Sequence, residues 1–162
     1  MSTNDDSFLE RSEVRIERTF AAPPARVFRG WTDPELMAQW MWAGMGGEPW
    51  AQNDLRVGGA YRAYTKAPGG THQGEGWSGM CGLYVEIVPD TKLVYTVHWD
   101  ADVFYNRPGN LTLDEVVTVE LTPDGERTRM VFVHAGLPDD EKCIETHRGG
   151  IAYTFDTLAK LL

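Results

Sequence analysis

The sequence predicts an α+β fold, and three observations support this prediction. The middle of the chain is a succession of β-branched and aromatic runs separated by turn signals such as APGG and TPDGE, which is typical of a β-sheet. Two short helical patterns precede these runs, and a long amphipathic pattern follows them. The connections between the runs are too short for parallel crossovers, so we expect an antiparallel sheet that buries the stripe of the final helix on one face.

The composition indicates one domain. The 162 residues are 42% hydrophobic and 24% charged, and Pro and Gly are too dispersed to form a linker. We expect residues 1–12 to form a mobile leader and residues 13–162 to form a single domain. The chain has 15 Lys plus Arg against 24 Asp plus Glu, a net charge of −9 with no basic stripe, so no nucleic-acid partner is expected.

The N-terminus and the cysteines indicate the compartment. The start, MSTNDDSFLERSE, is acidic and polar, unlike a secretory signal, and no apolar run approaches the length that crosses a bilayer. We therefore expect a cytoplasmic protein without a membrane partner. Cys81 and Cys143 lie far apart and form no C-x-x-C motif. They are expected to be inert thiols rather than part of a disulfide framework, a zinc site or a nucleophilic centre.

The N-terminal part of the chain predicts one strand and two short helices. Residues 14–20, VRIERTF, alternate with period two, as a half-buried strand does. Two prolines then open a short helix, PARVFRGW. Asp33, placed before another proline, begins a second helix because its side chain can cap free backbone N–H groups. Trp40 lies on the apolar face of that helix, and Trp42 and Trp50 follow soon after.

The remaining elements are strands and one long helix. From Leu137 onward the chain predicts an amphipathic helix, with Asp139, Asp140 and Glu141 suited to the positive end of the helix dipole. Its apolar stripe consists of Ile144, His147, Ile151, Phe155, Leu158 and Leu162. The runs expected as strands are DLRVGGAYRAYTK, WSGMCGLYVEIV, KLVYTVHW, VVTVEL and RTRMVFVHAGL.

Several phrases occur together and in a characteristic order: RTFAAPPARVFRGWTDPELMAQWM, DLRVGGAYR, GLYVEIVP, KLVYT, TVELTPDGERTRM and VHAGLP. With them the sequence resembles the SRPBCC (START-like) superfamily over about residues 13–162. The nearest branch is the one named for homologues of the activator of the heat-shock-protein-ninety ATPase. The resemblance implies a helix-grip (Bet-v-type) fold, in which a curved antiparallel sheet wraps around the C-terminal helix. In many relatives the cavity between sheet and helix holds an apolar small molecule.

Function follows less directly from the resemblance, because the superfamily includes lipid carriers, polyketide cyclases, plant hormone receptors and chaperone activators. Eukaryotic activators of the chaperone carry a separate N-terminal domain, for which 162 residues leave no room. The first hypothesis is therefore a START-like module that binds a small apolar or aromatic ligand. The alternatives are an enzyme of the polyketide cyclase or hydrolase kind and a protein-interaction module of the chaperone-activator kind.

Two motif interpretations can be set aside. The stretch GEGWSG, residues 74–79, matches G-x-G-x-x-G, but a dinucleotide site needs a helix to start at the glycines, whereas MCGLYVEIV continues as a strand. Glycines that permit bends in a curved sheet explain the stretch better. The histidines, His72, His98, His134 and His147, show no ligand spacing, so no metal is expected.

Acid–base chemistry has candidate residues but no motif. Glu75, Glu86 and Asp100 could serve as a general acid or base if buried in a cavity. For Glu86 a structural hydrogen bond is an equal explanation. In the enzyme alternative His134, His147 or Glu86 acts in the pocket, and no catalytic residue is assigned.

His134 and His147 are candidate cavity residues. Alternation places Phe132 and His134 on one face of a strand, and His147 shares the helix stripe with Phe155. Both imidazoles could therefore face one cavity. The alternative is that each satisfies a neighbouring backbone group.

The aromatic residues provide the other candidates. Alternation puts Tyr95 and Trp99 on one face of KLVYTVHW, and AYRAY offers Tyr61 or Tyr64 from a neighbouring strand. Trp40 is expected to form a wall or flap at one end of the cavity. Plain core packing is the alternative for all of them.

The last helix departs from the resembling family at two positions, with Phe155 in place of the usual leucine as one of them. Relatives in this branch commonly carry a tryptophan where this chain has Ile151, and the smaller side chain should enlarge the cavity. A small apolar ligand is the expected partner, with no cofactor and with a homodimer left open. The expected ligand-binding residues are Trp40, Tyr61, Tyr95, Trp99, Phe132, His134, His147, Ile151 and Phe155.

Overall fold

A computed structural model describes residues 11–44, 47–66, 77–100 and 115–162. Seven strands form one antiparallel sheet in the order β1-β7-β6-β5-β4-β3-β2. The strands are β1 (Arg11–Phe20), β2 (Glu48–Asn53), β3 (Ala60–Lys66), β4 (Trp77–Val88), β5 (Lys92–Asp100), β6 (Glu115–Asp124) and β7 (Arg127–Pro138). The helices are α1 (Pro24–Thr32), α2 (Pro34–Trp40) and α3 (Glu141–Leu161).

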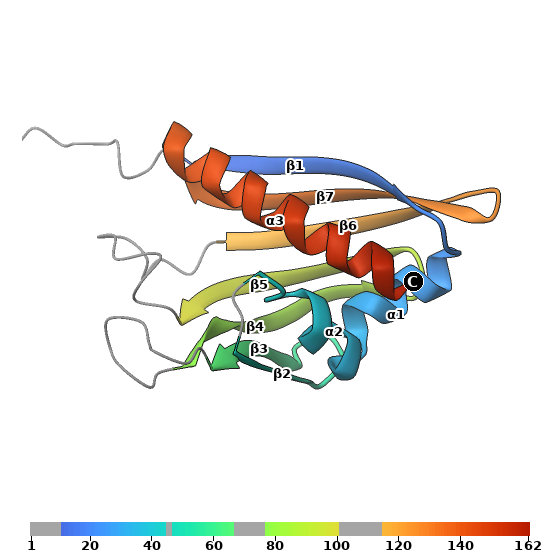
Figure 1. The fold of residues 1–162 in the computed structure, drawn as a ribbon, viewed down its shortest axis with the longest axis horizontal. Helices are drawn as coiled ribbons and strands as arrows, with labels where there is room; N and C mark the ends of the chain where they lie inside the picture. The colour runs from blue at the N-terminus through green and yellow to red at the C-terminus, as the bar shows by residue number, and fades with distance from the viewer. Residues whose placement is uncertain (1–10, 45–46, 67–76, 101–114) are drawn as a thin grey trace, which may run out of the picture.

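The arrangement confirms the predicted helix-grip fold. Figure 1 shows α3 crossing obliquely in front of β7 and β6, with its C-terminal end beside α1. The two short helices follow β1 and join it to the opposite edge strand, β2. The inner face of the curved sheet and the three helices thus enclose one core. No described helix is long and apolar enough to cross a membrane.

The strands differ from the sequence prediction in four places, one of which is β6, which runs three residues beyond the expected VVTVEL at its end and one before its start. β1 begins at Arg11, earlier than the expected Val14. β2 was missed, because EPWAQN is short and contains a proline that edge strands tolerate. β3 begins later than expected, because residues 54–59 form a turn in which Gly58 adopts a φ of 81°.

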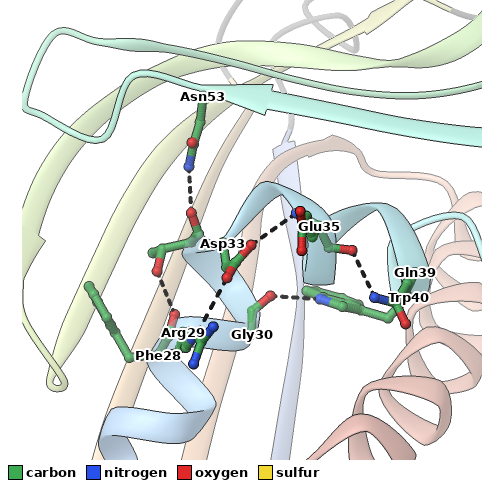
Figure 2. Close-up of polar contacts among 9 residues, drawn as sticks. Phe28, Arg29, Gly30, Asp33, Glu35, Gln39, Trp40 and Asn53 are labelled. Atoms are coloured by element: carbon green, nitrogen blue, oxygen red, sulfur yellow. Dashed lines mark hydrogen bonds and ion pairs between the residues drawn. The ribbon is translucent and has the colours of Figure 1, made fainter.

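The short helices are fixed by polar contacts that Figure 2 shows. Asp33 caps α2, since its side chain accepts a hydrogen bond of 3.0 Å from the Glu35 N–H. The Asn53 amide donates to the Thr32 carbonyl at 2.7 Å, which ties β2 to the end of α1. The prediction that Asp33 starts a helix is therefore confirmed.

The long helix packs closely on the rest of the core. Asp140 caps it by accepting a hydrogen bond of 2.9 Å from the Cys143 N–H. The predicted stripe is buried at His147, Phe155 and Leu158, but Ile144, Ile151 and Leu162 are only half-buried. Near its C-terminal end the helix approaches α1, where a Cβ on Gly30 would lie 2.8 Å from the Leu158 Cδ1 atom.

Some sequence predictions fall outside the described residues. These are the first ten residues of the leader, His72, Glu75 and residues 74–76 of the glycine motif. The side chain of Asp100 is also outside them. The rest of the motif lies in β4, which starts at Trp77 and continues as a strand, so the expected strand after the glycines is confirmed.

Candidate ligand-binding cavity

A cavity of about 310 Å³ lies between the inner face of the sheet and α3. Strands β5, β6 and β7 form its floor, α3 covers it, and the ends of α1 and α2 close one side. The residues that line it are mostly aromatic or aliphatic. They are Trp31, Trp40, Met41, Trp42, Gly44, Met80, Tyr95, Val97, Trp99, Val117, Phe132, His134, Thr146, His147, Gly150, Ile151, Tyr153, Thr154 and Phe155.

The structure brings eight of the nine predicted residues together at this cavity. They are Trp40, Tyr95, Trp99, Phe132, His134, His147, Ile151 and Phe155. Tyr61 does not line it. Its ring is buried beside Tyr84 and Tyr95, and its hydroxyl donates a hydrogen bond of 2.7 Å to the Thr96 carbonyl.

One end of the cavity is a cluster of aromatic rings. Trp31 from α1 lies edge to face with Trp40 from α2, at a centroid distance of 4.7 Å. Phe132 stacks on Trp31 at 6.0 Å, and Phe155 from α3 packs on both Phe132 and Trp31. Such pairs contribute about 0.5–1.5 kcal/mol each beyond the burial of area. This end is therefore both core and cavity wall.

The opposite end carries polar groups. The Nε2 atom of His134 lies 3.1 Å from the Oε1 atom of Glu115. The same oxygen accepts a hydrogen bond of 3.1 Å from the Trp99 indole. The side chains of His134 and Glu115 are only 4% and 13% exposed, so this pair is largely shielded from water. The carboxylate thus fixes two rings of the cavity wall, and we call Glu115, His134, Trp99 and His147 the polar end.

The topology explains why these four residues meet. Glu115 begins β6, Trp99 lies near the end of β5, and His134 lies in the last part of β7, so three neighbouring strands present them at the same end of the sheet. His147 comes from the second turn of α3 and packs above them. Its ring centroid is 5.6 Å from that of His134 and 5.8 Å from that of Trp99.

The rim of the cavity combines the segment after α2 with α3. Trp42 is half-buried and donates a hydrogen bond of 2.9 Å to the Ala63 carbonyl, and its ring meets Trp99 at 6.2 Å. On the helix side, Tyr153 is 55% exposed and lies against Gly44, where a Cβ would be 3.0 Å from the tyrosine Cε1 atom. Trp42, Gly44 and Tyr153 all line the cavity, so the segment after α2 and the helix α3 meet in its wall here.

Burial perturbs the titration of two tyrosines at and beside the cavity floor. Loss of contact with water, and secondarily the neighbouring Tyr84, raise the pKa of Tyr95 well above its ordinary value. Burial raises the pKa of Tyr61 in the same way. A phenol is neutral at physiological pH in any case, so the raised pKa matters only above about pH 10, where Tyr95 stays protonated in the folded protein.

Other candidate residues lie elsewhere. Glu86 is exposed on β4 and pairs with the Lys92 ammonium group at 3.2 Å, so the suggestion that it acts in the pocket is wrong. Cys143 is buried at the start of α3, and Cys81 and His98 are half-buried on strands and do not line the cavity. Within the described part of the chain, no three His, Cys, Asp or Glu side chains gather as a metal site would require.

The sequence reasoning missed several residues of the site. Glu115 precedes VVTVEL and alternates with Val117 and Val119, both buried, so extending that strand pattern by one residue would have placed it on the inner face. Trp31 and Trp42 carry no comparable signal, because their positions depend on how the short helices dock.

The helix-grip fold with an apolar cavity under its long helix defines a START-like domain. The model of the family described as Activator of Hsp90 ATPase homolog 1-like protein matches residues 21–162, and the chain belongs to this family. No curated protein matches the sequence.

Solved structures with the same fold come from several bacteria. Protein CV1439 from Chromobacterium violaceum is 29% identical, with 92% of this chain and 95% of that chain covered and a TM-score of 0.70. Protein Mll3558 from Rhizobium loti is 25% identical, with 94% and 98% covered and a TM-score of 0.70. Protein NE0264 from Nitrosomonas europaea, 24% identical with 92% of each chain covered and a TM-score of 0.71, shows the fold alone.

Proposed function

We propose that this protein binds a small apolar or aromatic ligand in the cavity between the sheet and α3. The observation that carries the proposal is the preformed cavity of about 310 Å³ with its aromatic lining. Ligand sites are typically concave, mostly apolar and equipped with a few polar groups, and their volumes start at roughly 300 Å³. An apolar cavity of about 150 Å³ already accepts benzene, so there is room here for a ligand of two rings or more.

The distribution of polarity supports the same function. Flat rings at the Trp31 and Trp40 end suit an aromatic or aliphatic body, and His134 and His147 at the other end suit a hydrogen-bonding group.

Two measurements test the proposal. Native mass spectrometry of freshly purified protein should detect a retained small molecule, released on denaturation. Titration of the protein with the apolar probe N-phenyl-1-naphthylamine should give saturable fluorescence enhancement at one site. A protein that carries no small molecule and gives no saturable probe signal would contradict ligand binding.

A second candidate is acid–base catalysis on the bound molecule. The observation that favours it is the hydrogen bond between His134 and Glu115, because a carboxylate that orients an imidazole is a recurrent arrangement in general-base catalysis. This candidate would be supported if the protein converted a molecule identified by mass spectrometry and if the His134→Gln variant no longer converted it. Chaperone activation rests on the family description alone and ranks third.

A further inference from the structure

The polar end of the cavity has a charge pattern that restricts the ligand. Because the Glu115 carboxylate lies directly behind His134 and Trp99 of the described cavity wall, we propose that the cavity selects an uncharged ligand with a hydroxyl-type group over its carboxylate counterpart. This inference rests on the proposed ligand binding and names the chemistry of the ligand's polar group.

The first step concerns positive charge. No Lys or Arg is among the described residues that line the cavity, and only His134 and His147 among them can become cationic. Since His134 contacts the carboxylate of Glu115, the pair carries a net charge of −1 when the imidazole is neutral and zero when it is protonated. Neither state of this pair supplies surplus positive charge, so His147 is the only described lining residue left that could offer one to an anionic ligand.

The second step concerns burial. A charged group that leaves water without a partner loses its hydration, and the low dielectric of the cavity strengthens its repulsion from a nearby like charge. A ligand carboxylate at the polar end would experience both effects, because Glu115 is largely buried and one side chain removed from the cavity surface. An aliphatic or aromatic carboxylate is therefore disfavoured relative to its alcohol.

The third step concerns cations. An ammonium group would be attracted to Glu115, but the Oε1 atom of that residue already accepts from both Trp99 and His134. Both of these rings line the cavity whereas Glu115 does not, so the rings separate the carboxylate from the cavity space. A ligand cation would lose its hydration without reaching that oxygen, so the uncharged group is preferred to the cation as well.

A neutral hydroxyl meets none of these costs. It can donate or accept, and imidazole rings offer a donor or an acceptor according to the tautomer. Thr146 and Thr154 of α3 also line the cavity, and because their hydroxyls donate to carbonyls of their own helix, they can only accept from a ligand. The ring system of the ligand would then occupy the aromatic end beside Trp31 and Phe132.

Four naphthalene probes test this selectivity by isothermal titration calorimetry near pH 7: naphthalene, 2-naphthol, 2-naphthoate and 2-naphthylmethylammonium. We expect 2-naphthol to bind at least about tenfold more tightly than 2-naphthoate and more tightly than the ammonium probe. Binding of 2-naphthoate or of the ammonium probe as tightly as 2-naphthol would overturn the inference. Absence of binding by all four probes would contradict the proposed function itself.

A charge-neutralising variant identifies the group responsible. Glu115→Gln keeps the size of the side chain and an oxygen that can accept from Trp99, so we expect 2-naphthoate to bind at least about fivefold more tightly than to the wild type. Glu86→Gln, which removes an exposed carboxylate outside the cavity, is the matched control. It should leave the affinities for 2-naphthoate and 2-naphthol unchanged. The role of Glu115 would be overturned if Glu115→Gln, shown by thermal melting to be folded, had the same ratio of 2-naphthol affinity to 2-naphthoate affinity as the wild type.

Discussion

The indole rings of Trp31 and Trp40 meet edge to face, and this contact joins two consecutive helices at one end of the cavity. The Trp40 Nε1 atom donates a hydrogen bond of 2.8 Å to the Gly30 carbonyl, which is in α1 next to Trp31 (Figure 2). The Trp40 ring cannot swing outward without breaking this bond. The aromatic residues of the short helices therefore form a fixed wall, not a mobile flap.

We predict that Trp40→Phe lowers the free energy of unfolding by about 1–3 kcal/mol, because the Gly30 carbonyl is left buried without its donor. The variant should also bind N-phenyl-1-naphthylamine more weakly, since a smaller ring leaves part of the wall out of contact. Urea unfolding and fluorescence titration measure the two effects. Trp50→Phe, on the exposed edge strand β2, is the control. A folded Trp40→Phe with wild-type affinity would remove Trp40 from the site.

The buried tyrosines predict a loss of stability at alkaline pH. Burial raises the pKa of Tyr95 in the folded protein, whereas in the unfolded chain the value returns to about 10. Above that pH the unfolded state releases a proton that the folded state retains, so stability is complete below about pH 10 and declines as the pH rises further. Tyr95→Phe should make this decline shallower in urea unfolding measured from about pH 8 to 11. Parallel declines in the variant and the wild type would contradict the assignment.

The strands of the sheet were predictable where alternation was strong, as in KLVYTVHW, because the inner face must be apolar over several residues. β2 lacked such a pattern. It is held by pairing with β3 and by the Asn53 amide on the Thr32 carbonyl, both of which depend on tertiary contacts. Edge strands of this kind leave little trace in a single sequence.

The residues of the site likewise fall into those that alternation predicts and those that depend on tertiary contacts. His134 and His147 were expected to face one cavity, because each lies on the inward face of a regular element, and they line it together. Tyr61 is also buried on the inner face, but its hydroxyl donates to the Thr96 carbonyl of β5, two strands away, and its ring does not line the cavity. Periodicity identifies the face that a residue occupies. It does not identify which part of that face remains unfilled.

The contact between His134 and Glu115 predicts an energetic coupling. His134→Phe removes the group that faces the carboxylate and should lower the free energy of unfolding by about 1–3 kcal/mol. In a Glu115→Gln background the same change should cost less, because no charge is left without compensation. A double-mutant cycle in urea near pH 7 should thus give a coupling of at least about 0.5 kcal/mol.

The exposed pair of Glu86 and Lys92 serves as the control for that cycle. Its ions are about 3.2 Å apart but solvent-exposed, so their coupling should fall at the low end of roughly 0–1 kcal/mol. Additive effects of His134→Phe and Glu115→Gln would mean that the two side chains are neighbours without a significant interaction.

Ile151 offers a way to close the cavity from α3. It is half-buried, lines the cavity and lies one helical turn before Phe155, so a larger ring at this position would point into the same space. We predict that Ile151→Trp abolishes binding of N-phenyl-1-naphthylamine. Its thermal stability should be unchanged or increased, because the added ring fills a void instead of displacing packed atoms.

The two readouts of Ile151→Trp separate an open cavity from an ordinary core. In a filled core, the extra volume would force neighbouring side chains out of their rotamers and cost on the order of 1–3 kcal/mol, seen as a clear drop in melting temperature. Ala159→Trp, on the exposed side of the same helix, controls for the effect of a tryptophan on α3 and on protein fluorescence, and should bind the probe as the wild type does. A drop in melting temperature with probe binding retained would mean that the space beside Ile151 is already occupied and that the probe binds elsewhere. Full stability with binding lost is the result that ligand binding under α3 requires.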